Sequence, residues 1–187
     1  MHRQILETYE ISTHTIAIMP AYDIECETLV LEGHQTLYVK ETAIQMIKRA
    51  CIEGGATYDG RRQAVSELTR AQNKIPIPIN TTSQIYAFPT HSPTHLECVW
   101  LFYHHIKSFH PHPFEPAKTI VQLYNNNPLT IDISYPSFER QMQRTSYCMV
   151  KLSYQASYHT PQLFHPNYKL HGAIHTFPNG LVNQIPS

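Results

Sequence analysis

Charged residues are scarce in this sequence. Asp, Glu, Lys and Arg together make up 15% of its 187 residues, against roughly 25% in an average soluble protein. Such a composition excludes a charge-driven disordered chain, a coiled coil and a basic tail protein. The 14 basic residues equal the 14 acidic residues in number. Taken at face value, a net charge of zero also argues against a nucleic-acid binder, which is usually basic.

Long apolar runs and clustered cysteines are missing as well. The longest uninterrupted apolar or aromatic run, Cys98 to Tyr103, is far shorter than the roughly 20 residues that a membrane span needs. The first residues contain no apolar segment of the kind found in secretory signals. The cysteines lie far apart along the sequence and form no CxxC pair. This spacing is not that of a disulfide scaffold. We therefore expect a cytoplasmic protein with reduced thiols and no membrane partner.

Glycine is rare, with six residues against 14 prolines, and aromatic residues make up 11% of the chain. This balance favours a β-rich domain with rigid turns. Strands are expected where β-branched and aromatic residues gather between turn residues, at 15–19, 28–31, 36–39, 85–88, 97–109, 119–124 and 129–133. With the helices described next, these strands predict an α+β fold, namely an antiparallel β-rich single domain with two or three helices.

The first helix is predicted after Thr42, which forms a capping-box pattern with Gln45 and is followed by apolar residues at helical spacing. This helix is predicted to end at Gly54 and Gly55, because glycine is favoured at helix C-termini. A C-terminal amphipathic helix is predicted near 137–153 from apolar residues that recur at steps of four and three. We expect one domain over residues 1–155 and an irregular or flexible tail over 156–187, which contains no Asp or Glu.

The zero net charge is a cancellation between segments of opposite sign. Residues 1–45 contain two basic and seven acidic residues, a net charge of −5, and residues 81–135 contain two and three, a net charge of −1. Residues 46–80 contain six basic and three acidic residues, and residues 136–187 contain four and one, so each segment has a net charge of +3. Because a local field decides whether a polyanion can dock, neutrality does not exclude DNA binding.

A pair of arginines follows a possible helix start at Asp59. If Asp59 caps a helix, Arg61 and Arg62 lie at its N-terminus, where the macrodipole disfavours positive charge and a visiting anion would explain them. The competing structure is a hairpin around Asp59-Gly60, which would place the pair just past its tip. The other interpretation is that the two arginines are adjacent on the surface by chance.

The C-terminal helix carries a second basic feature. At 100° per residue, four side chains fall within one narrow stripe opposite its apolar face: Arg140, Arg144, Tyr147 and Lys151. This stripe could lie along a phosphate backbone, or it could be the solvated face that every amphipathic helix has.

Two further alternatives compete with nucleic-acid binding. His91, His95 and Cys98 have zinc-ligand types at workable spacing, which would suit a zinc-dependent enzyme or a zinc-stabilised domain, although 13 histidines produce such spacings by chance. A protein-interaction domain that binds no DNA would use exposed aromatic residues. No P-loop, GxSxG or HExxH motif is present, and nothing selects one cysteine as a nucleophile.

A series of short motifs is distributed along the sequence: Ala50-Cys51, Gly55, Tyr58, Gly60-Arg61-Arg62, Glu67, Lys74, Pro76-Ile77, Gln84-Ile85, Phe88-Pro89-Thr90, Cys98, Trp100, His105, Lys107, Phe109, Ile133-Ser134-Tyr135, Ser137-Phe138-Glu139, Gln141 and Arg144-Thr145. In their order and near-constant spacing, these motifs resemble those of the bacterial competence transcription factor (ComK) family over residues 8 to 152, most of the chain. The segment after residue 155 departs from the family pattern.

The resemblance implies a transcriptional activator of genes for DNA uptake, not an enzyme, that needs no cofactor. Its implied partners are double-stranded AT-rich promoter DNA bound largely through the minor groove, a second copy of itself in a dimer or tetramer, RNA polymerase, and an adaptor that delivers it to a Clp protease. It implies a cytoplasmic protein that associates with the nucleoid when bound to DNA.

From the positions of the basic residues we predict which side chains contact DNA. Arg61 and Arg62 are expected to reach a narrow AT-rich minor groove. The predicted phosphate contacts are Lys48, Arg49, Arg70 and Lys74. Arg140, Arg144 and Lys151 would form a second contact surface or part of an oligomer interface. Gln84 offers an uncharged donor, whereas Tyr58 and Trp100 are predicted to be core residues.

Overall fold

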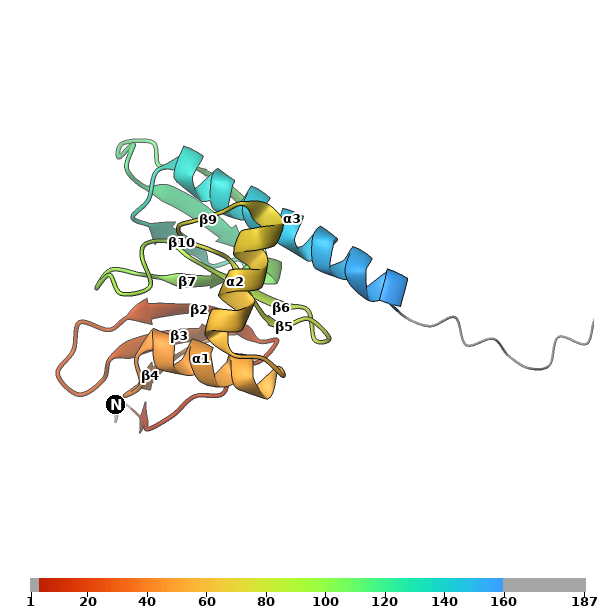
Figure 1. The fold of residues 1–187 in the computed structure, drawn as a ribbon. Helices are drawn as coiled ribbons and strands as arrows, with labels where there is room; N and C mark the ends of the chain where they lie inside the picture. Colours follow the sequence, from red (N-terminus) through yellow and green to blue (C-terminus); the bar gives the residue numbers. More distant parts are fainter. Residues whose placement is uncertain (1–3, 160–187) are drawn as a thin grey trace, which may run out of the picture.

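The computed structural model describes residues 4–159, which fold into three α-helices and two sheets (Figure 1). The predicted α+β class with a C-terminal helix is confirmed. The helices are α1 (Ala43–Glu53), α2 (Tyr58–Thr69) and α3 (Tyr135–His159), together with one 3-10 turn, η1 (Tyr103–His105). Residues 160–187, which make up most of the predicted tail, lie outside the described part of the chain.

The larger sheet has seven strands in the order β1-β4-β3-β2-β7-β6-β5, and the smaller has three in the order β10-β9-β8. Neighbouring strands are antiparallel except for β1 and β4. The strands are β1 (Ile5–Leu6), β2 (Thr15–Pro20), β3 (Thr28–Glu32), β4 (Gln35–Val39), β5 (Ile77–Asn80), β6 (Ile85–Pro89), β7 (Trp100–Phe102), β8 (Ile106–Pro111), β9 (Thr119–Leu123) and β10 (Pro128–Ile131).

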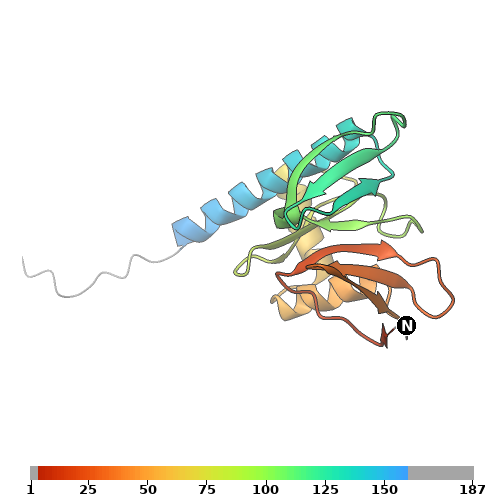
Figure 2. The ribbon, with the colours of Figure 1, turned by 180° about the vertical axis from the view of Figure 1, so that it is seen from behind.

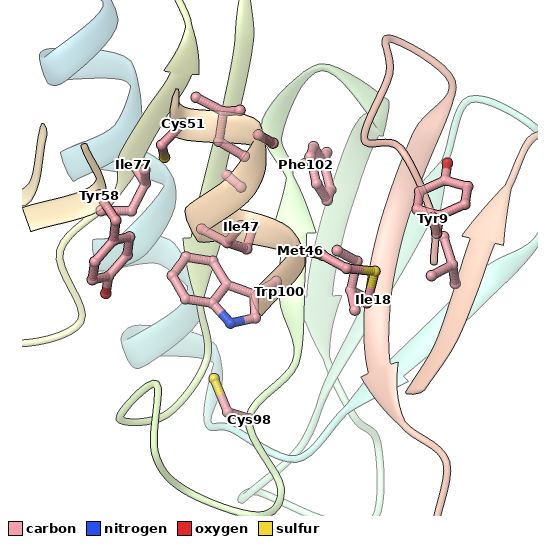
Figure 3. Packing of buried hydrophobic residues seen from close by; sticks show 14 of the residues in the cluster. Tyr9, Ile18, Met46, Ile47, Cys51, Tyr58, Ile77, Cys98, Trp100 and Phe102 are labelled. Atoms are coloured by element: carbon pink, nitrogen blue, oxygen red, sulfur yellow. The ribbon is translucent and has the colours of Figure 1, made fainter. Parts of the chain in front are cut away.

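Alternate residues of β7 serve two hydrophobic cores, because successive side chains of a strand point to opposite faces of its sheet. Trp100 and Phe102 pack with residues of α1 (Figure 3). Leu101 packs with the smaller sheet and with Phe138 of α3. The prediction that Tyr58 and Trp100 are core residues is confirmed, since both side chains are buried. Burial on both faces also explains why this segment reads as one continuous apolar run.

The strand predicted over residues 97–109 is interrupted. The chain leaves the larger sheet at the end of β7, turns through η1, and enters the smaller sheet as β8. His104 and His105 therefore lie in one tight turn and not in a strand. The sequence predicts a single strand here because β-branched and aromatic residues are favoured in both sheets, on either side of η1.

The capping box predicted at the start of α1 is present. The Thr42 hydroxyl oxygen accepts a hydrogen bond from the Gln45 amide at 3.4 Å, and the Gln45 side-chain oxygen accepts one from the Thr42 amide at 2.9 Å. These bonds satisfy amide groups that the first turn of a helix leaves without partners. Gly54 is the C-cap, as the sequence predicted.

The segment after Gly55 forms helix α2, so the alternative of a hairpin around Asp59-Gly60 is wrong. Thr57, not Asp59, is the N-cap, and its hydroxyl accepts a hydrogen bond from the Gly60 amide at 3.1 Å. Asp59 lies in the first turn, where its negative charge is favoured by the helix dipole. The helix ends at Arg70, which adopts a left-handed conformation.

Helix α3 is longer than the predicted 137–153, and residues 156–159, assigned to the tail from the sequence, belong to the helix. Its buried side chains recur at steps of three and four residues: Phe138, Gln141, Thr145 and Cys148. Figures 1 and 2 show the C-terminal part of α3 projecting beyond the two sheets. Within residues 4–159, no helix combines the length and the apolar composition that crossing a membrane requires.

Candidate nucleic-acid interface

The two basic segments of the sequence meet where α3 packs near the connection between α2 and β5. Lys74 comes from this connection, and Arg140 and Arg144 come from successive turns of α3. These three side chains line a cleft of about 210 Å³, which we call the cationic cleft, whose other lining residues are Asn73, Ser137 and Gln141. No carboxylate of the described residues lines it. Three positive charges therefore share one small space.

Gln141 holds the two walls of the cationic cleft together. Its side chain is 2% exposed, and its amide nitrogen donates to the backbone oxygens of Lys74 and Pro89, both at 2.8 Å. Because a buried amide without partners is costly, these two bonds fix α3 against the α2–β5 connection and the end of β6. Gln141 lies three residues after Phe138 and four residues before Thr145, and this spacing is the signal in the sequence that its side chain faces the core.

The backbone around the cationic cleft is unusual. Arg70 and Lys74 have φ angles of 59° and 51°, in the left-handed region that costs a residue with a side chain roughly 1–2 kcal/mol. Arg144 donates to the backbone oxygen of Asn73 at 3.3 Å and to the side-chain oxygen of Gln141 at 3.4 Å. Both acceptors are uncharged, so Arg144 is oriented while its charge is left available to an anion.

Arg61 has a partner within the protein. Its guanidinium donates to the backbone oxygen of Gly54 at 2.5 Å and to that of Cys51 at 3.4 Å. These are carbonyls at the C-terminal end of α1, where the helix dipole favours a positive charge. Arg61 does lie near the start of α2, as expected, but these carbonyls offset its charge, so it does not need a visiting anion. The sequence could not show that the end of α1 lies beside the start of α2.

Arg49 is also engaged inside the molecule. It forms an ion pair with Glu41, lies 3.8 Å from a carboxylate oxygen of Glu53, and donates to the backbone oxygen of Tyr9 at 2.6 Å. The hydrogen bond to Glu41 raises the pKa of Arg49, so its charge is held and balanced locally. We therefore regard Arg49 as a link between the N-terminal segment and α1.

The remaining predicted contact residues are spread over the surface. Arg62 is exposed on α2 and lines a second hollow together with Asp59 and Glu67. The other exposed side chains are Lys48 on α1, Gln84 in the turn between β5 and β6, and Lys151 on α3, whose ammonium lies 5.4 Å from the centre of the Tyr147 ring. None of these four lines the cationic cleft.

The arrangement of His91, His95 and Cys98 does not support the alternative of a zinc site. The rings of His91 and His95 are stacked with their centroids 5.0 Å apart, and the thiol of Cys98 donates to the backbone oxygen of His91 at 3.6 Å. Across residues 4–159, no three His, Cys, Asp or Glu side chains are grouped so that they could hold one metal ion. Burial, followed by the charge of Lys74, lowers the pKa of His91.

The cysteines do not have the environment of nucleophiles. Cys26, Cys51, Cys98 and Cys148 are all buried. Burial raises the pKa of the Cys51 thiol to about 11 and that of Cys148 to about 12, and it also raises the pKa of Cys98. Because the thiolate is the reactive form, these three side chains are structural.

Comparison with known proteins agrees with the resemblance seen in the sequence. The family model described as ComK protein matches residues 6–157. The competence transcription factor of Bacillus subtilis (strain 168) is 32% identical over 158 residues, which cover 84% of this chain and 81% of that protein. No solved structure shows significant similarity to the chain. Since the family match spans both sheets and nearly all of α3, the chain belongs to the ComK family.

Proposed function

We propose that this protein regulates transcription of competence genes by binding duplex DNA at the cationic cleft. The regulatory role, and the conclusion that the protein is not an enzyme, follow from its family and from the relative named a competence transcription factor. The observation that carries the DNA-binding part is that Lys74, Arg140 and Arg144 share one cleft that no carboxylate of the described residues lines. A backbone phosphate is the ligand that such a group of cations favours.

The contact residues divide by their surroundings. Lys74, Arg140 and Arg144 bind one or two adjacent phosphates, and Arg70 extends this surface from the end of α2. Arg62, exposed on the neighbouring helix face, is the arginine best placed to enter a narrow minor groove. The peripheral contacts are Lys48, Gln84 and Lys151. Arg49 and Arg61 act indirectly, because their hydrogen bonds hold the helices that carry the others.

The finer features of the proposed binding mode are those that the family resemblance implies. We propose recognition of AT-rich boxes largely through the minor groove, by an oligomer, in the cytoplasm at the nucleoid. RNA polymerase and an adaptor to a Clp protease are the further proposed partners. Minor-groove reading predicts that A·T content and the spacing of boxes matter more than the order of A and T.

Base substitution tests this mode directly. A promoter duplex in which A·T pairs are replaced by I·C pairs keeps the minor-groove pattern of A·T but presents the major-groove pattern of G·C. We expect the I·C duplex to bind within about 3-fold of the A·T duplex, and a G·C duplex at least about 10-fold more weakly, because each mismatched position costs about 1–3 kcal/mol. Equal weakening of the I·C and G·C duplexes in a gel shift would instead indicate major-groove reading.

Arg70 provides a test that separates stability from binding. Arg70→Gly relieves the left-handed conformation at the end of α2 and is expected to raise the free energy of unfolding by about 0.5–1 kcal/mol. Loss of one phosphate contact is expected to weaken DNA binding by about 5-fold at 100 mM salt. Urea unfolding and fluorescence anisotropy measure the two effects, and Arg70→Lys is the charge-retaining control. A variant that is less stable, or that binds DNA as tightly as the original chain, would contradict this assignment.

A further inference from the structure

A groove of about 400 Å³ lies at one end of the larger sheet. Its walls are the connection between β2 and β3, the N-terminus of α1, and the connection between β6 and β7. These parts lie together at the left of Figure 1, away from the projecting end of α3, and Figure 2 shows the same arrangement from behind. The groove shares no residue with the cationic cleft. A partner bound there and DNA at the cleft would therefore contact different residues.

The rim of this groove exposes large apolar side chains. Tyr22 and Leu96 line it from opposite connections and are 76% and 85% exposed. Ile24, in the same connection as Tyr22, is fully exposed. Single exposed apolar residues are common on protein surfaces, but a group that rims a groove is typical of a protein-interaction site.

The floor of the groove contains a buried donor without an acceptor. Trp100 lines the groove and is fully buried. Its indole nitrogen has no hydrogen-bond partner among the described residues, and Figure 3 shows this nitrogen on the ring edge nearest Cys98, which also lines the groove. Because buried N–H groups are almost always paired, this one points to an acceptor that the described part of the chain does not supply.

The groove is also acidic. Asp23 and Glu27 line it, and Glu25 and Glu97 are exposed in the same two connections. Within residues 4–159, none of the three glutamates takes part in an ion pair, and no Lys or Arg lines the groove. A positively charged occupant is therefore complementary to it.

We infer that this groove binds an extended peptide segment of another protein, in which an apolar side chain lies next to Lys or Arg. The apolar side chain packs between Tyr22 and Leu96, the cation lies beside Glu27, and a backbone carbonyl accepts the hydrogen bond of the Trp100 indole. This interaction is separate from the proposed DNA binding and does not depend on it.

A random octapeptide library displayed on phage tests the inference against the full chain. We expect enriched sequences to combine an apolar residue with Lys or Arg, and synthetic copies to change the emission of Trp100, the single tryptophan of the chain. Labelled peptides then measure affinity by anisotropy. Leu96→Asp should weaken binding at least 10-fold and Glu27→Lys at least 3-fold.

The matched control is Phe114→Asp, which places the same charge on an apolar side chain that is 87% exposed elsewhere. It should bind the peptides within 2-fold of the unmodified chain. The inference is overturned if no sequence is enriched, if the enriched sequences are acidic, or if Leu96→Asp and Phe114→Asp have equal effects. DNA binding by the Leu96→Asp variant should be unchanged, so the two functions can fail separately.

Discussion

Replacing Lys74, Arg140 and Arg144 together by alanine is expected to weaken DNA binding by roughly 100-fold at 100 mM salt, because each lost phosphate contact costs about 1 kcal/mol under these conditions. The effect should be nearly the same for every duplex sequence, since phosphate contacts position a protein without reading bases. Arg140 is exposed and Lys74 and Arg144 are half-buried, so the triple variant should remain folded. Fluorescence anisotropy with an AT-rich duplex measures the loss.

A second triple variant controls for net charge. Lys40, Lys107 and Lys118 lie outside the cationic cleft, and replacing all three by alanine removes the same number of positive charges. We expect this control to bind DNA within about 3-fold of the unmodified chain, because distant surface charges are largely screened at this ionic strength. Equal losses in the two triple variants would show that total charge, and not the cleft, determines binding.

Replacing Gly54 by alanine is expected to lower the free energy of unfolding by about 3 kcal/mol or more, because the structure has no room for the added methyl group. A Cβ atom at this position would lie 2.2 Å from the backbone oxygen of Ile79 and 2.9 Å from the Arg61 guanidinium. The end of α1 would have to move away from β5, and the hydrogen bond from Arg61 to Gly54 would be strained.

Gly33→Ala is the matched control for this substitution. Its Cβ atom would meet nothing within 4 Å, and only its positive φ of 57° opposes a side chain, at a cost of about 1–2 kcal/mol. Urea unfolding of both variants measures the difference. Equal stability of the two would contradict the close packing of α1 against β5.

Local sequence signals predicted much of the fold. The capping box at Thr42 and the spacing of apolar residues in α3 predicted two helices, because both depend on residues three or four apart. The break at η1 was not predictable in this way. Whether an apolar segment stays in one sheet or crosses to another depends on packing partners that are distant in sequence.

The candidate site was predicted only in part. Segmental charge identified both basic regions, but not that Lys74 and Arg144 share a cleft, since these two residues are 70 positions apart in the sequence. Nor could the sequence predict that Arg61 donates a hydrogen bond to the end of α1, or that Arg49 donates one to Tyr9 and forms an ion pair with Glu41. Because of those interactions, the main candidates for DNA contact are the residues of the cationic cleft and not the Arg61-Arg62 pair.

The salt dependence of DNA binding tests the central claim most directly. Between 50 and 200 mM salt, the logarithm of the binding constant should fall linearly with the logarithm of the salt concentration for the unmodified chain. In the variant lacking Lys74, Arg140 and Arg144, the magnitude of this slope should be smaller by about 0.9–1.8, which corresponds to the loss of one or two neutralised phosphates. An unchanged slope in this variant would show that the cationic cleft does not hold the DNA backbone.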